Sequence, residues 1–273
     1  MAVLALIGAA CGVGSGPGGT PKPTSTTAPP DPDRVILRVD DEGGFAPAAF
    51  ALNRVPRFVL FADGRLVFPG PQPAIFPGPL LPSLQTVTLS SDQMRQVLDL
   101  VDAIGLPRID REIDDSNNRF VADATTTTVT WFDDAGRAHT YGAYALGLVD
   151  DRRAEAREQT RLLSELLTTL DEFASTGDPA DPYLPERIQL RLEDASALDP
   201  EFKDAREWPL ALSPDDFEPA AFGLGCTTFA GRAASDALAS LEDATDTTVW
   251  TYAGREYQIL VRPLFPGEPG CTP

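Results

Sequence analysis

Apolar or β-branched residues alternate with polar ones in several stretches from Arg34 onward, a period typical of strands that bury one face. Three stretches consist of a strand-like run, a tight turn that ends in Gly-Arg, and a second strand-like run. They predict β-hairpins at Phe58–Phe68, Thr128–Tyr141 and Thr248–Val261. Gly64, Gly136 and Gly254 supply the positive φ that such turns need. Single strands are expected at Arg34–Val39, Gln85–Leu89 and Arg187–Leu192.

Apolar residues at helical spacing predict three helices between these strands. The first follows a capping box formed by Ser90 and Gln93 and stops at Gly105. The second extends from about Asp150 to Phe173, and the third from about Gly231 to Ala244. The residues expected to face a core are Met94, Val97, Leu98, Val101 and Ile104 in the first helix, Leu163, Leu166, Leu167, Leu170 and Phe173 in the second, and Ala234, Ala237, Leu238 and Leu241 in the third.

A helix followed by a hairpin occurs twice, with Trp131 and Trp250 in corresponding first strands. This order predicts an α+β fold of antiparallel hairpins with about three helices packed on one face, organised as two similar lobes. The Asp/Pro-rich stretch Ser175–Glu186 is the best candidate boundary. We therefore expect one lobe over residues 34–185 and a smaller helix-hairpin lobe over residues 186–273.

The N-terminal region has a different character. Met1–Ala10 is apolar or small, Cys11 follows, and residues 12–33 are rich first in Gly and then in Pro and Thr. The sequence "IGAAC" resembles the lipobox of bacterial lipoproteins. That resemblance implies a signal peptide over residues 1–10, cleavage before Cys11, a diacylglycerol on its thiol, and a stiff tether over residues 11–33.

Two positions depart from the lipobox pattern. Gly8 stands where the class prefers an aliphatic residue, and no Lys or Arg precedes Cys11, so we expect the natural start to lie upstream of Met1. The alternative is an N-terminal core strand with an incidental cysteine. The resemblance implies that the chain lies on the extracytoplasmic face of the cell membrane and is attached to that membrane by its lipid anchor.

The charge balance narrows the classes of partner. The chain has 41 Asp and Glu against 22 Lys and Arg, a net charge of −19, while 42% of its 273 residues are hydrophobic and can form a core. An acidic surface of this kind repels phosphate backbones and anionic lipid headgroups, so we expect no nucleic-acid partner.

Cys226 and Cys271 are the two thiols that remain if Cys11 is acylated. An exported chain meets an oxidising environment, so we predict that these two cysteines form a disulfide. The bond would join the C-terminal tail to the segment before the last helix.

Motifs for catalysis are lacking. The single histidine, His139, lies in a predicted strand with no G-x-S-x-G sequence to present a serine, so we interpret it as an ordinary strand residue. The acidic stretch Asp110–Asn118 fails as a calcium loop that begins at Asp114, because Arg119 replaces the required glycine and Thr125 the closing glutamate. We interpret it as a solvated loop, and an irregular calcium site near Asp114 is the alternative. We predict no metal and no cofactor.

The stretch Val67–Pro82 contains Phe-Pro-Gly-Pro twice, and Phe-Pro-Gly returns at Phe265–Gly267. Pro and Gly make such a loop stiff, so it can present apolar side chains at low entropic cost. We hypothesise a binding surface formed by Phe68, Phe76, Leu80 and Leu81, with a protein or another cell-envelope component as the partner. Three alternatives stay open: these side chains complete the core, the chain is a hydrolase that uses acidic residues, or it is a structural envelope component.

Overall fold

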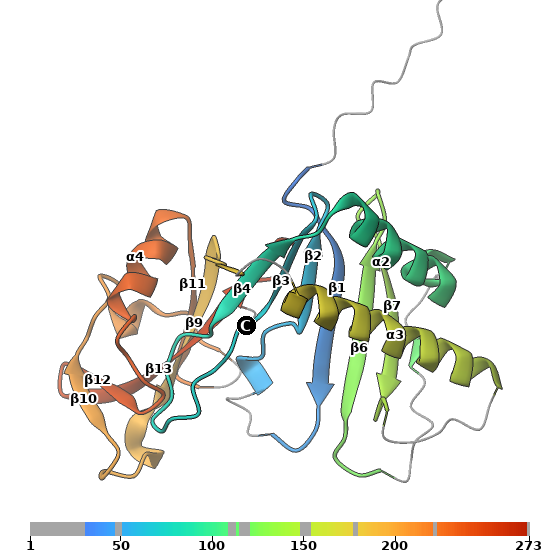
Figure 1. Ribbon diagram of the computed structural model, residues 1–273. Helices are drawn as coiled ribbons and strands as arrows, with labels where there is room; N and C mark the ends of the chain where they lie inside the picture. The colour runs from blue at the N-terminus through green and yellow to red at the C-terminus, as the bar shows by residue number, and fades with distance from the viewer. Residues whose placement is uncertain are drawn as a thin grey trace, which may run out of the picture. The chain divides into compact units, whose positions relative to one another are not determined.

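The computed structural model describes residues 31–46, 51–108, 113–114, 121–147, 154–176, 180–220 and 223–271. These residues form two mainly antiparallel sheets and three α-helices, which confirms the predicted α+β fold class (Figure 1). Asp31–Pro273 is one compact unit, and residues 1–30 lie outside the described residues.

The eight-stranded sheet has the order β5-β7-β6-β1-β2-β3-β4-β8. Neighbouring strands are antiparallel except for the pair β5 and β7. Its strands are β1 (Val35–Gly43), β2 (Phe58–Phe61), β3 (Arg65–Pro69), β4 (Leu84–Thr88), β5 (Ile113–Asp114), β6 (Thr125–Phe132), β7 (Ala138–Tyr144) and β8 (Asp181–Pro182).

The five-stranded sheet has the order β10-β12-β13-β9-β11, and only its β10–β12 pair is parallel among the described strands. Its strands are β9 (Arg187–Asp194), β10 (Asp204–Glu207), β11 (Gly225–Ala230), β12 (Thr248–Tyr252) and β13 (Arg255–Leu264). The chain passes from one sheet to the other between Pro182 and Arg187.

The three predicted hairpins form as β2–β3, β6–β7 and β12–β13. Gly64, Gly136 and Gly254 have φ values of 92°, 76° and 78°, so each takes the left-handed conformation expected of it. In the last hairpin Ala253 has positive φ as well, which gives the two-residue turn the twist that antiparallel strands require.

Helix α2 (Ser91–Ile104) begins and ends as the sequence predicts. Ser90 accepts a hydrogen bond from the Gln93 backbone, the Gln93 side chain accepts one from the Ser90 backbone, and Gly105 closes the helix in the left-handed conformation. The prediction for Leu98 is wrong, because this side chain is exposed and Leu100 is buried instead. The buried stripe is Val97, Leu100, Val101 and Ile104, whose spacing places them on one face of the helix.

Helices α3 (Ala154–Thr176) and α4 (Arg232–Ser240) cover one sheet each. The predicted start of the second helix near Asp150 lies outside the described residues, and α4 ends at Ser240, before the predicted end at Ala244. Figure 1 shows α2 and α3 lying across the same face of the eight-stranded sheet.

Clusters of buried side chains hold these layers together. The largest in the described part of the chain joins α2 and α3 to the eight-stranded sheet, and a second joins α4 to the five-stranded sheet. A third lies on the opposite face of the eight-stranded sheet, where Phe265, from the segment after β13, packs with Val59, Phe61 and Val67. The C-terminal segment is therefore part of the core of the other sheet.

Candidate functional site

The loop between β3 and β4 carries the predicted binding residues. Hydrogen bonds hold it at its base and at its far part. Its base is closed by the hydrogen bond from Gly70 N to Ser83 O, at 2.8 Å. Its far part is fixed to the five-stranded sheet, because Leu80 N donates to Ala244 O and Asp246 N donates to Gly78 O, both at 2.9 Å. The loop is thus anchored by backbone hydrogen bonds at two separate places.

The four predicted binding residues have different surroundings. Phe76 is 67% exposed, whereas Leu80 and Leu81 are half-buried against the core of the five-stranded sheet. Phe68 is buried at 8% exposure, which corrects its place in the predicted surface. Strand β3 continues through Phe68, and its alternation turns this ring toward the helices α2 and α3, together with Leu66.

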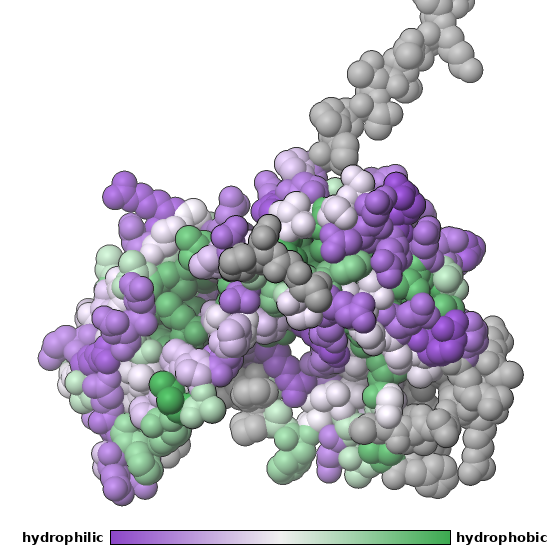
Figure 2. All heavy atoms as spheres, viewed as in Figure 1, coloured by the Kyte–Doolittle hydropathy of each residue, from purple (hydrophilic) through white to green (hydrophobic). Residues whose placement is uncertain are grey.

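Two further residues join Phe76 at the surface: Ile75 is 65% exposed and Phe202 is 46% exposed. The rings of Phe76 and Phe202 meet edge to face, with centroids 5.3 Å apart. We call Ile75, Phe76 and Phe202 the apolar tip. Figure 2 shows hydrophobic atoms at the surface near the end of this loop, within a largely hydrophilic face.

Ile75 had a sequence signal, since it precedes Phe76 in the second Phe-Pro-Gly-Pro segment. Phe202 had none, because it is a lone aromatic residue in the polar stretch "DPEFKD". Only the fold brings it to Phe76.

The surroundings of the apolar tip are acidic. Glu201 precedes Phe202 and is exposed, and the exposed Asp246 lies beside Gly78, where an added Cβ would be 3.4 Å from its carboxylate. Lys203 is paired with Glu256 at 2.7 Å, so its charge is balanced within the chain.

A group of charged side chains, Arg38, Asp40, Arg262 and Glu268, lies between the two sheets. Arg38 of β1 donates to both carboxylate oxygens of Asp40, at 2.6 and 2.7 Å, and its third nitrogen donates to Glu268. Glu268 is buried and also accepts from Arg262 of β13 at 2.6 Å. Burial alone would lower the pKa of Arg38, but Asp40 and Glu268 outweigh it, so its pKa is raised.

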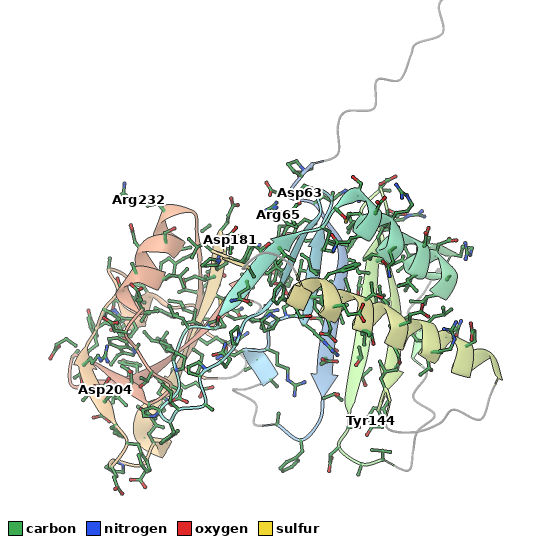
Figure 3. All side chains as sticks on the ribbon, viewed as in Figure 1. Asp63, Arg65, Tyr144, Asp181, Asp204 and Arg232 are labelled. Carbon is green, nitrogen blue, oxygen red and sulfur yellow. A yellow bond between two sulfur atoms is a disulfide. The ribbon has the colours of Figure 1, made fainter. Side chains whose placement is uncertain are left out.

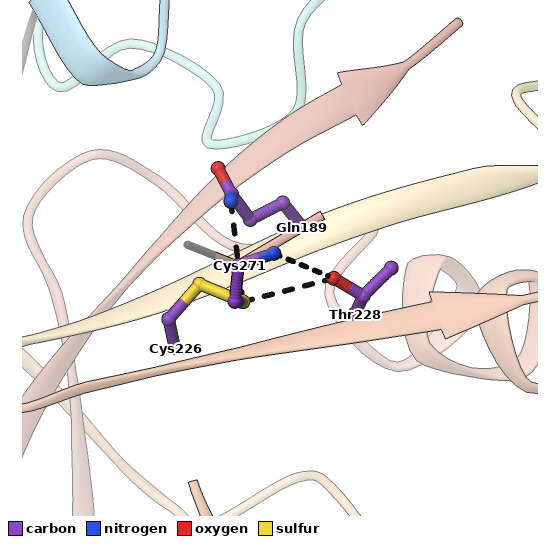
Figure 4. The surroundings of a disulfide bond; sticks show 4 residues. All are labelled: Gln189, Cys226, Thr228 and Cys271. Carbon is purple, nitrogen blue, oxygen red and sulfur yellow. Dashed lines mark hydrogen bonds between the residues drawn. A yellow bond between two sulfur atoms is a disulfide. The ribbon is translucent and has the colours of Figure 1, made fainter. Parts of the chain in front are cut away.

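The disulfide holds the C-terminal segment beside these charged side chains. Cys226 of β11 is bonded to Cys271, which confirms the predicted pair, and Figure 4 shows Thr228 and Gln189 beside it. Thr228 Oγ1 accepts from the backbone of Cys271 at 3.2 Å. A Cβ at Gly270 would come within 2.5 Å of the same oxygen, so this close approach requires glycine.

His139 lies in β7 beside the turn of its hairpin, with Nε2 3.5 Å from Asp133 Oδ2. Asp133 accepts from the backbone of Arg137 and Ala135 and from the Arg137 side chain. These hydrogen bonds, together with one from His139, lower the pKa of Asp133 to about 2. Asp133 therefore stabilises the turn as a carboxylate, which is a structural role.

Acidic side chains are spread over the part of the chain that the structure describes. Figure 3 labels Asp63 in the turn between β2 and β3, Asp181 in β8 and Asp204 in β10. The pKa values of Asp133, Glu158 and Asp194 are all lowered, in the direction opposite to that of a general acid. Among the described residues, no group of three or more His, Cys, Asp or Glu side chains is placed to hold a metal ion.

Two sequence predictions lie outside the described residues. One is the lipidation site Cys11, and the other is the acidic stretch 110–118, of which only the short strand β5, with Asp114, is described. None of the helices in the described part of the chain is long and apolar enough to span a bilayer.

Comparison with protein-family models, with curated proteins and with solved structures found no match to this chain.

Proposed function

We propose that this chain is a lipid-anchored, extracytoplasmic binding domain that holds a protein partner at the apolar tip. The observation that carries the proposal is the exposure of Phe76 on a loop whose base and far part are both fixed by backbone hydrogen bonds. An exposed apolar side chain on a fixed backbone contributes little to folding, but it loses little freedom when it is covered by a partner.

The tip has the composition expected of an interface centre. Aromatic anchors such as Phe76 and Phe202 bury a large area per residue when a partner covers them. The acidic residues around them, Glu201 and Asp246, favour a partner whose own rim is basic. The proposed partner is therefore a protein with an apolar pocket and a basic border.

The membrane part of the proposal rests on the N-terminal sequence. Cys11 would carry a diacylglycerol, whose two chains hold a protein stably at a bilayer, whereas one chain binds only marginally. Residues 12–33 would then act as the spacer. Cys11→Ser in the full chain should move the protein from the membrane fraction to the medium or leave its leader uncleaved, and intact-mass analysis distinguishes these forms.

Site-specific photo-crosslinking tests the binding surface. A benzophenone amino acid replaces Ile75 in one full-length chain and Arg95 in a control chain, since Arg95 is an exposed residue on α2. The probe at position 75 should give a discrete adduct in cells that naturally produce the chain, and Phe202→Ser should weaken that adduct. Equal adducts from both positions, or none from position 75, would contradict the proposal.

A further inference from the structure

Strand β9 buries both of its faces. Leu190 and its alternate neighbours Ile188 and Leu192 belong to the core beneath α4. Gln189 and Arg191 point to the opposite side by the alternation of the strand, yet they are only 4% and 8% exposed. A polar face that is normally open to water is therefore enclosed here.

These residues line a cavity of about 390 Å³ between the two sheets. We call it the inter-sheet cavity. Its charged or polar lining residues are Arg38, Asp40, Asp41, Glu42, Arg54, Gln189, Arg191 and Arg262. A cavity of this size is within the range of small-ligand sites.

Arg191 differs from Arg38 and Arg262 of the same lining. Those two arginines both pair with Glu268. Arg191 forms no ion pair or hydrogen bond with any residue that the structure describes, and its Nε is buried without a partner. Burial, and then the charge of Arg262, lower the pKa of Arg191, against the opposing effect of Glu193.

An enclosed guanidinium without a carboxylate is unfavourable for the folded chain. Arginine stays protonated in proteins, so this side chain does not escape the cost of burial by losing its charge. Arg38 shows that the same fold can supply two carboxylates to a buried arginine. Among the described residues Arg191 has no such ion pair, and Glu193 acts on it through its charge alone.

We propose that the inter-sheet cavity binds a small monovalent carboxylate, with the Arg191 guanidinium as its charge partner. This inference goes beyond the binding of a protein at the apolar tip and rests on different residues. The planar fork of arginine matches a carboxylate through two parallel hydrogen bonds.

The other charges of the cavity select a monoanion. Asp40, Asp41 and Glu42 also line it, and Glu268 lies beside Arg38 and Arg262. Arg38, Arg54, Arg191 and Arg262 stand against Asp40, Asp41, Glu42 and Glu268, so the cavity carries no excess positive charge. A dianion would therefore be repelled more strongly than a monoanion that pairs with Arg191 alone. The carboxylate can belong to a free small acid or to the C-terminus of a peptide, and both present the same group to Arg191.

Titration of the full chain with defined probes tests the proposal. The probes are acetate, N-acetyltriglycine, the amide of N-acetyltriglycine, and inorganic phosphate, and the readout is the NMR signal of the arginine Nε–H groups. Acetate and N-acetyltriglycine should shift the Arg191 signal in a saturable way, and the amide should not. Equal affinities for the two acids identify a small acid as sufficient, and a tighter N-acetyltriglycine complex identifies a peptide terminus.

Arg191→Met provides the decisive variant, with Arg95→Met as the matched control for loss of one positive charge. Arg191→Met should weaken carboxylate binding at least tenfold without lowering the melting temperature, because it removes a buried charge that has no ion pair to lose. Arg95→Met should leave binding unchanged. If Arg191→Met does not fold, Arg191→Lys replaces it and should weaken binding because the fork is lost.

Three results would overturn the proposal: no saturable shift with either acid, tighter binding of phosphate than of both acids, or equal affinity in the wild type and the folded Arg191 variant. None of them bears on crosslinking at position 75, so this proposal and the proposed protein-binding function can fail separately.

Discussion

Residues 68–71 and 76–79 have the same sequence, Phe-Pro-Gly-Pro, and opposite environments. Phe68 is 8% exposed and Phe76 is 67% exposed. The first phenylalanine is the last buried residue of β3, where pairing with β4 fixes its direction. The second lies in a loop that is fixed at other points, so no strand alternation turns its ring inward.

The shorter sequence Phe-Pro-Gly also occurs at Phe265–Gly267, and its phenylalanine has an environment like that of Phe68. Phe265 is 2% exposed and stacks on Tyr183, with ring centroids 5.6 Å apart. Its backbone N–H donates to Glu268. Proline and glycine stiffen all three segments. The residues that surround each segment decide whether its phenylalanine is buried in a core or exposed at the surface.

Phe68→Ala should have the largest effect on stability. The ring is enclosed by the core beneath α2 and α3, so its removal should lower the free energy of unfolding by about 3–5 kcal/mol. Urea unfolding followed by circular dichroism measures this loss. A loss below about 1 kcal/mol would place Phe68 with Phe76 and end the contrast between the two segments.

Removal of the disulfide should have the next largest effect, since it releases the tail after Phe265. Cys226→Ala with Cys271→Ala should lower the free energy of unfolding by roughly 2–4 kcal/mol, because the bond closes a long loop in the unfolded chain. The same unfolding experiment measures it, with the reduced wild type as the control. Unchanged stability in both samples would show that the tail is held without the covalent bond.

Phe76→Ala should have the smallest effect. The side chain is exposed and contacts Phe202 through one ring edge, so the free energy of unfolding should change by no more than about 0.5 kcal/mol. Phe68→Ala is the matched control, with the same chemical change in the same tetrapeptide. A loss of several kcal/mol at Phe76 would assign it to the core.

Local signals explain which elements were predictable. Turn glycines such as Gly64, the capping box at Ser90 and the apolar spacing of α3 each act over a few residues, and the structure contains these features where they were expected. No local signal predicts strands β10 and β11, because "DARE" and "GCTTFA" lack clear alternation and form strands only by pairing with distant ones.

The candidate sites depend even more on distant contacts. The alternation in β9 correctly predicts that Leu190 and Arg191 lie on opposite faces of the strand. It does not predict that β1 and the C-terminal segment cover the face that carries Arg191. In the same way, Phe76 was predictable as a loop aromatic, whereas its contact with Phe202 joins segments far apart in the sequence. The sequence therefore predicts which side chains are available, and the topology decides which of them meet.

The most direct test of the central claim is the adduct yield from a photo-crosslinker at position 75, compared between full-length chains with and without Phe76→Ala. If the apolar tip binds a protein, Phe76→Ala should strongly reduce the yield while the chain remains as stable as the wild type. An undiminished yield from a folded Phe76→Ala chain would contradict the claim that Phe76 is exposed for binding.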